Sequence, residues 1–175
     1  MKALKTSIIT FLLLQTVVSF GQTKEETEQW INEKMKSYEG KINSKEDTDE
    51  FYDFSLRDGK LSVTIIHTDY YRKGGVMFKK ERIVNNVSIN KLEIYGKDVT
   101  FPDKGKFSFV FKLRSNASYD ILCKDFEDEE GTTESKQCED KITLWLRLGE
   151  ENIGERLEKA FVHYATFFPE KKETF

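Results

Sequence analysis

The chain has 175 residues, with 28 lysines and arginines against 31 aspartates and glutamates, and a formal net charge of −3. This acidic balance argues against a nucleic-acid-binding protein, because phosphates attract a strongly basic face, and against tight binding to anionic membranes. About 154 residues follow the first 21, which is the usual size of one domain and enough to bury a substantial core.

The first 21 residues, MKALKTSIITFLLLQTVVSFG, have the pattern of a secretory signal peptide. Lys2 and Lys5 precede an apolar stretch, and the small residues Ser19 and Gly21 stand at positions −3 and −1 before Gln22. The stretch is too short and too polar at its end for a membrane-spanning helix, which needs ~20 apolar residues. We therefore expect cleavage before Gln22, a periplasmic or secreted protein with a net charge of about −5, and no stable membrane insertion after cleavage.

Residues 22–43 predict an N-terminal helix and a linker. Thr23 and Glu26 have the spacing of a capping box, and Gly40 is placed to end the helix, which we expect over 24–39. An apolar stripe recurs at helical spacing between them: Trp30, Ile31, Met35 and Tyr38.

Between residues 50 and 148 the apolar pattern changes to a period of two, which predicts about seven short strands that pair as antiparallel neighbours along the chain. The pair Asp58-Gly59 predicts a two-residue hairpin. Alternating apolar residues flank it and define the expected core face: Tyr52, Phe54 and Leu56 before the turn, and Leu61, Val63 and Ile65 after it.

The C-terminal part of the chain predicts an amphipathic helix. Asn152 and Glu155 form a potential capping pair, and Pro169 ends the helix, so that 169–175 are expected to be a frayed tail. The apolar residues lie on one helical face: Ile153, Leu157, Ala160, Phe161, Tyr164 and Phe168.

This order of elements resembles the pleckstrin-homology-like barrel. The segments that carry the resemblance are FSLRDGKLSVTII, ERIVNNVSINKLEI and IGERLEKAFVHYATFF, within 44–168. The resemblance implies one α+β domain in which a C-terminal helix caps a bent, antiparallel sheet of about seven strands. The chain is similar to small exported bacterial proteins of unknown function that add a helix before this barrel. Phosphoinositide-binding members carry a basic loop between the first two strands, whereas this chain has only RDGK, so we do not expect lipid binding.

Cys123 and Cys138 are the only cysteines. In an exported protein an even number of cysteines favours a disulfide. Their spacing is not Cys-x-x-Cys, which argues against a redox centre, and a zinc site needs about four ligands. We expect a disulfide, with two free thiols as the main alternative.

The run DFEDEE at 125–130 is acidic enough to suggest calcium binding. Counted from Asp125, however, an EF-hand loop would have Glu130 where glycine is required and Lys136 where glutamate is required. We therefore expect a solvated hairpin tip. The sequence predicts no metal site and no cofactor.

Two features suggest a partner surface. A basic cluster (Arg72, Lys73, Lys79, Lys80 and Arg82) fits an acidic partner or a lipopolysaccharide phosphate. Lysines on a strand also protect a sheet edge, and this interpretation is favoured. Trp145 points away from the face of Leu144 and Leu146, so it either anchors a partner or, as we expect, packs beneath the N-terminal helix.

The two histidines are the remaining candidates for catalysis. His67 continues the parity of Ile65 and is expected to face inward at a strand end, while His163 lies on the polar face of the C-terminal helix. The sequence pairs neither with an activated nucleophile, so no catalytic residue is predicted.

The sequence therefore predicts an exported, non-enzymatic binding or interaction domain for an unknown protein or surface ligand. One alternative is a periplasmic inhibitor or immunity protein that blocks a basic enzyme, as the net charge permits. Another is a small-ligand carrier or an enzyme that uses the barrel mouth, which requires polar groups that converge in a cavity.

Overall fold

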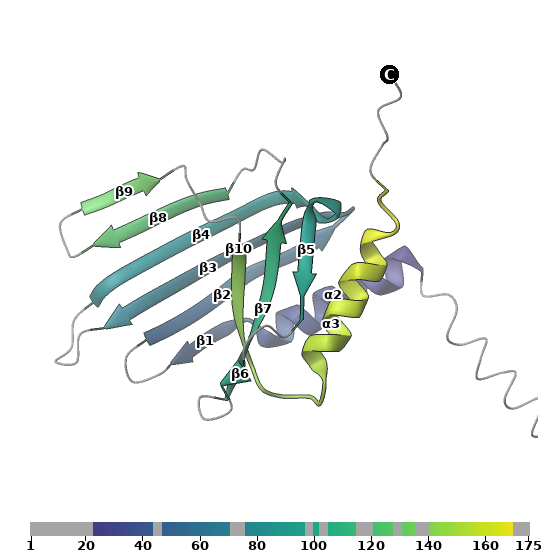
Figure 1. Ribbon diagram of the computed structural model, residues 1–175, viewed down its shortest axis with the longest axis horizontal. Helices are drawn as coiled ribbons and strands as arrows, with labels where there is room; N and C mark the ends of the chain where they lie inside the picture. Colours follow the sequence, from purple (N-terminus) through teal and green to yellow (C-terminus); the bar gives the residue numbers. More distant parts are fainter. Residues whose placement is uncertain are drawn as a thin grey trace, which may run out of the picture.

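The computed structural model describes residues 23–43, 47–70, 76–96, 100–101, 105–114, 121–127, 131–135 and 141–169. These residues form an α+β fold with two antiparallel sheets, the α-helices α2 (Lys24–Tyr38) and α3 (Ile153–Ala165), and a single 3-10 turn at Ile89–Lys91 (Figure 1). The α+β class is therefore confirmed, and so are the two expected helices to within a few residues at each end.

The larger sheet has six strands in the order β1-β2-β3-β4-β8-β9. Strands β2, β3 and β4 follow one another along the chain, whereas β8 joins β4 only after the chain has built most of the second sheet. The strand bounds are Gly40–Asn43 for β1, Asp47–Arg57 for β2, Lys60–Tyr70 for β3, Val76–Ser88 for β4, Ile121–Glu127 for β8 and Gly131–Ser135 for β9.

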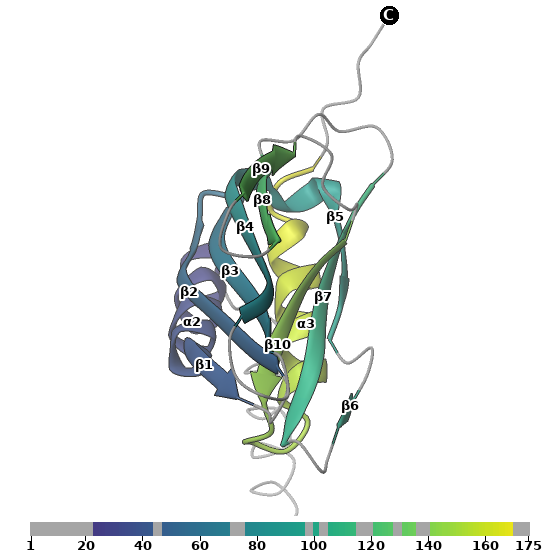
Figure 2. The same cartoon turned by 90° about the vertical axis from the view of Figure 1, so that its left-hand side faces the viewer.

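The smaller sheet has the order β10-β7-β5, and β6 also pairs with β7. Its strands run across those of the larger sheet in Figure 1, and Figure 2 shows the two sheets as separate layers. The strand bounds are Leu92–Tyr95 for β5, Thr100–Phe101 for β6, Lys106–Leu113 for β7 and Lys141–Arg147 for β10.

The two sheets are not closed into a barrel in the part of the chain that the structure describes. The expected single barrel of about seven strands, all paired with their neighbours in sequence, is corrected accordingly. The period of two determines which face of a strand is apolar, but it carries no information on which strand pairs with which. The pairings β4–β8 and β7–β10 therefore follow from tertiary packing.

The core lies between the layers at the end where α3 packs. The ring of Phe161 on α3 lies 6.4 Å from that of Phe54 on β2, and 5.6 and 5.2 Å from those of Phe109 and Phe111 on β7. All four side chains are buried, and most of the ring pairs have the edge-to-face geometry that aromatic rings prefer. Helix α3 therefore contacts both sheets.

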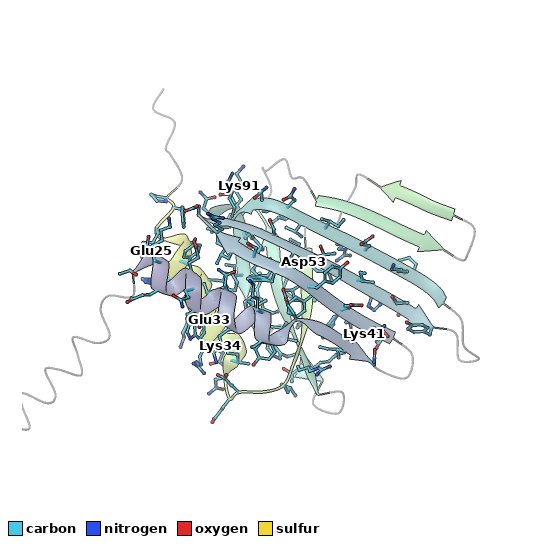
Figure 3. The ribbon with its side chains drawn as sticks, turned by 180° about the vertical axis from the view of Figure 1, so that it is seen from behind. Glu25, Glu33, Lys34, Lys41, Asp53 and Lys91 are labelled. Carbon is cyan, nitrogen blue, oxygen red and sulfur yellow. The ribbon has the colours of Figure 1, made fainter. Side chains whose placement is uncertain are left out.

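Helix α2 covers the edge of β2 beyond the end of β1, as Figure 3 shows from behind, with Glu33 and Lys34 along the helix. The side-chain amide of Asn32 accepts from the N–H of Leu56 at 2.9 Å and donates to its carbonyl oxygen at 2.7 Å. The carboxylate of Glu39 accepts from the N–H of Phe54. These side chains satisfy backbone groups that an edge strand would otherwise leave unpaired.

The turn between β2 and β3 is the predicted two-residue hairpin. Asp58 and Gly59 have φ of 48° and 72°, as a type I′ turn requires. A bulge at Asp53, with φ of 55°, shifts the register of β2 between Tyr52 and Ser55. Because of this extra residue Phe51 is buried and Tyr52 is not, so Tyr52 does not belong to the core face on which it was expected.

The helix caps differ in how well their sequences predict them. The capping box of α2 is present, with the Thr23 hydroxyl accepting from the N–H of Glu26 at 3.1 Å and the Glu26 carboxylate accepting from the N–H of Thr23 at 3.0 Å. The expected cap of α3 is wrong, because Asn152 has φ of 55° and makes no side-chain capping bond. The start of α3 is fixed instead by Gly154, which lies against Gly96 after β5.

Candidate functional site

A pocket of about 210 Å³ opens between the larger sheet and β10, and α3 contributes no residue to its lining. We call it the His67 pocket. It is lined by Asp49, Glu50 and Phe51 of β2, Ile65 and His67 of β3, Lys80 and Arg82 of β4, and Thr143 and Trp145 of β10.

Strand register brings the charged residues of the pocket together. Asp49 on β2 is directly opposite His67 on β3, which is opposite Lys80 on β4. The next row on the same face runs from Phe51 through Ile65 to Arg82 in the same way. Residues directly opposite one another share a face of the sheet, so these rows form a continuous floor that is polar at one end and partly apolar at the other.

A buried ion pair joins the floor of the pocket to the smaller sheet. The Nζ atom of Lys106 on β7 lies 2.6 Å from Oδ2 of Asp49, and only 5% and 6% of the two side chains are exposed. The same Nζ atom lies 3.7 Å from a carboxylate oxygen of Asp47 and 4.8 Å from the centre of the Trp145 ring. Buried charges are stable only when well partnered, and this ammonium group is held by two carboxylates and an aromatic face.

His67 lies between two carboxylates. Its Nδ1 is 2.7 Å from Oδ1 of Asp49, and its Nε2 is 3.0 Å from Oδ1 of Asp69. The hydrogen bond to Asp49 raises the pKa of His67 above its ordinary value, although burial of the half-exposed ring opposes this shift. Since both acceptors are carboxylates, the imidazolium form satisfies both contacts by donating from each nitrogen.

This arrangement limits the chemistry of His67. A general base needs a ring nitrogen with a lone pair facing the substrate proton. Both nitrogens of His67 instead face carboxylates of the protein. The geometry therefore suits an electrostatic and structural role for the ring.

The structure places Trp145 differently from its favoured prediction. It lines the His67 pocket with the ammonium group of Lys106 over its ring, whereas α2 packs mainly on β2 and α3. The aromatic residue of α2, Trp30, packs against the core and lies 5.6 Å from the guanidinium of Arg156 on α3. Helix α2 buries its apolar stripe against β2 and α3, because the unpaired edge of β2 offers backbone groups that α2 satisfies.

The basic cluster is only partly described. Lys80 and Arg82 line the pocket, whereas Arg72 and Lys73 lie outside the described residues. Strand β4 lies between β3 and β8, so protection of a sheet edge is the wrong explanation for its basic residues. Nothing in the sequence placed Lys80 and Arg82 near Trp145, whereas in the structure all three line one pocket.

Several other predicted features lie outside the described residues. These are the signal segment 1–21, Cys138, the side chain of Cys123 and most of the acidic run. The backbone of Cys123 on β8 pairs with that of Ser135 on β9. The disulfide itself remains a prediction.

Sequence reasoning missed Asp49 and Lys106, which are central to the site. Asp47, Asp49 and Phe51 are spaced two apart and therefore share one face of β2. The bulge at Asp53 shifts the alternation by one residue, so the sequence does not reveal that this face is also the face of Phe54. Lys106 stands directly before the alternating phenylalanines of β7, where a lysine at a strand end is ordinarily exposed. A search for charged residues at the inward-facing positions of each predicted strand would have found Asp49. It would not have found Lys106, which alternates with the phenylalanines of β7.

A second hollow of about 560 Å³ lies between β5 and α3. It is larger and more open, and it exposes Tyr95 and Val162 at its rim. Its size does not make it the better candidate, because its lining has fewer charged side chains than that of the His67 pocket.

No group of three or more histidine, cysteine, aspartate or glutamate side chains that could hold a metal ion occurs among the described residues. Within the same ranges, neither α2 nor α3 has the length and apolar character of a helix that crosses a bilayer. Comparisons with protein-family models, with curated proteins and with solved structures found no match to this chain.

Proposed function

We propose that the protein is a non-enzymatic binding domain that holds its ligand in the His67 pocket. The observation that carries this proposal is the convergence of Trp145 with Lys80 and Arg82 over a floor fixed by the ion pair between Asp49 and Lys106. Ligand sites typically combine apolar and aromatic walls with a few placed polar groups. The strands that supply these groups are rigid supports, which favours a pre-formed site.

Binding is favoured over catalysis because of the contacts of His67. With Asp49 at one ring nitrogen and Asp69 at the other, the ring has no nitrogen available as a general base. An inhibitor of a basic enzyme would use an acidic outer surface, and contact at that surface would leave the environment of the Trp145 indole unchanged. The response of Trp145 therefore separates these roles.

The test uses the two tryptophans as probes. The chain contains only Trp30 and Trp145, so a ¹⁵N-labelled sample gives two indole N–H signals in an NMR spectrum, which a Trp145→Phe variant assigns. We expect a panel of small acids, amines and neutral metabolites at millimolar concentration to include a class that shifts the Trp145 signal and leaves the Trp30 signal in place. If no class moves the Trp145 signal, the proposal is wrong.

We also propose that the protein is exported and carries a disulfide between Cys123 and Cys138. The support is the signal-peptide pattern of residues 1–21 and the even number of cysteines. Mass spectrometry of protein recovered from the periplasm or the medium, before and after alkylation, is expected to show a chain that begins at Gln22 and takes up no alkylating reagent. Retention of Met1 contradicts the export proposal, and two alkylated thiols contradict the disulfide.

Kinship with the pleckstrin-homology-like fold is likewise proposed. It is supported by the succession β2-β3-β4, by the C-terminal helix that contacts both sheets, and by the corner where Arg147 donates to the carbonyl oxygen of Lys41 at 2.7 Å. An experimental structure in which β10 pairs with β1 would support this kinship. One in which the two sheets remain apart at that corner would contradict it.

A further inference from the structure

The charge at the apolar end of the pocket floor comes from Arg82. Its directly opposite neighbours are Ile65 on β3 and Cys123 on β8, neither of which is charged. The other cation of the lining, Lys80, is opposite Asp125 on β8 and His67 on β3. Arg82 therefore places a guanidinium group in the row of the floor that also holds Phe51 and Ile65.

Of the two carboxylates in the lining of the pocket, that of Asp49 is already engaged by the protein. Oδ1 of Asp49 contacts His67 and Oδ2 contacts Lys106, so both oxygens of this carboxylate are occupied. Glu50 also borders the pocket, but it follows Asp49 on β2, and alternation along the strand directs its side chain away from the floor that Asp49 and Phe51 form. A ligand in the pocket therefore meets cationic groups, those of Lys80 and Arg82, among the side chains of the lining.

The walls beside Arg82 are apolar. Phe51 and Ile65 form the rest of its row, and Trp145 faces them from β10. The ammonium group of Lys106 lies against the Trp145 ring and helps to fix its orientation. A volume of about 210 Å³ admits one ring or one short alkyl chain, and it is too small for a folded segment of a partner.

We propose that the ligand of the His67 pocket is a small organic acid, with its carboxylate on Arg82 and an aromatic or alkyl body against Trp145, Phe51 and Ile65. This inference rests on the proposed binding function. A guanidinium group matches the planar carboxylate and donates two parallel hydrogen bonds to it. The carboxylate belongs either to a free acid or to the last residue of a peptide, and both present the same group to Arg82.

The test compares an acid with its uncharged amide. Binding of 3-phenylpropionate and of 3-phenylpropionamide is followed by the indole signal of Trp145, with N-acetylphenylalanine as the peptide-like acid. The acid is expected to bind about tenfold or more tightly than the amide, since a hydrogen bond to a charged group contributes about that factor. A bound free acid with no response to N-acetylphenylalanine assigns the site to small molecules, and the reverse assigns it to peptide ends.

Variants of β4 supply the matched control. Arg82→Gln is expected to weaken the acid about tenfold while leaving the amide unchanged, and Arg82→Lys to give an intermediate loss because it keeps the charge without the planar pair of donors. Lys79→Gln, on the other face of the same strand, is expected to leave both affinities unchanged. If Arg82→Gln does not fold, Arg82→Lys and the comparison of acid with amide decide the matter.

The outcomes separate this inference from the proposed function. Equal binding of acid and amide, or a loss in Lys79→Gln as large as in Arg82→Gln, overturns the assignment of a carboxylate to Arg82 while the binding function stands. A Trp145 signal that responds to amines but not to acids likewise overturns the carboxylate assignment and leaves the binding function standing. A signal that responds to no probe of any charge overturns both.

Discussion

The side chains of Asp49, His67 and Lys106 form a charged network in an interior that is otherwise largely apolar. Each oxygen of the Asp49 carboxylate has its own cationic partner, Lys106 at 2.6 Å and His67 at 2.7 Å. Removal of one partner from a buried pair leaves a charge without compensation, at a cost of about 3–5 kcal/mol. The network therefore links β2 and β3 of the larger sheet to β7 of the smaller sheet, and it gives the pocket a fixed floor.

The raised pKa of His67 makes stability depend on pH. Because the hydrogen bond to Asp49 raises this pKa above the unfolded value of ~6.5, the native state binds the proton more tightly than the unfolded state does. The stabilisation is complete below about pH 6 and is lost as pH rises through the native pKa. Urea unfolding from about pH 5.5 to 8.5 is expected to show the wild-type advantage over His67→Gln shrinking with rising pH. An advantage that grows with pH contradicts this assignment.

At the scale of elements, close contact between backbones fixes the position of α3. A Cβ atom added to Gly154 would overlap the carbonyl oxygen of Gly96, and one added to Gly96 would overlap that of Gly154. The N–H of Gly96 donates to the carboxylate of Glu158, one turn further along α3, at 2.9 Å. Two glycines thus allow the first turn of the helix to lie directly on the chain that leaves β5.

Gly154→Ala is expected to destabilise the protein, although alanine is the better helix former. The new methyl group meets backbone atoms that cannot rotate away, and such overpacking costs typically about 1–3 kcal/mol. Lys159→Ala, at an exposed position of the same helix, is the control and is expected to be nearly neutral. Chemical unfolding monitored by circular dichroism measures both variants, and a Gly154→Ala protein as stable as the wild type would show that α3 moves freely relative to β5.

The elements themselves are largely predictable from the sequence, and their assembly is not. The alternation of apolar residues in the sequence located β3 and β7, and the Thr23 capping box located the start of α2. The bulge at Asp53 has no comparable signature, since an aspartate with positive φ looks like any polar residue of a strand. The position of Trp145 was predicted wrongly because the local pattern shows which face of β10 carries the side chain but not which element packs against that face.

At the scale of the molecule, two of the contacts that join the two sheets differ in their chemistry. Where α3 packs, the rings of Phe54, Phe109 and Phe161 lie together in an apolar cluster. At the His67 pocket the link is the ion pair of Lys106 with Asp49. The larger sheet consequently has an apolar region that provides stability and a polar region that remains partly open, which is where a ligand can enter without disrupting the core.

Phe161→Ala tests whether the apolar cluster holds the whole molecule together. The ring is fully buried and contacts Phe54 of one sheet and Phe109 and Phe111 of the other, so its loss is expected to cost about 3–5 kcal/mol. Val162→Ala, at the next and exposed position, is the control and should cost little.

The two tryptophans report on different places, because Trp30 lies on α2 against the core and Trp145 lies in the pocket. If the sheets depend on one another, both indole signals of the Phe161→Ala protein disappear at the same urea concentration, with an unchanged m value. A Trp145 signal that survives the loss of the Trp30 signal would instead mean that the pocket is held by its ion pair alone, and that the domain unfolds in two steps.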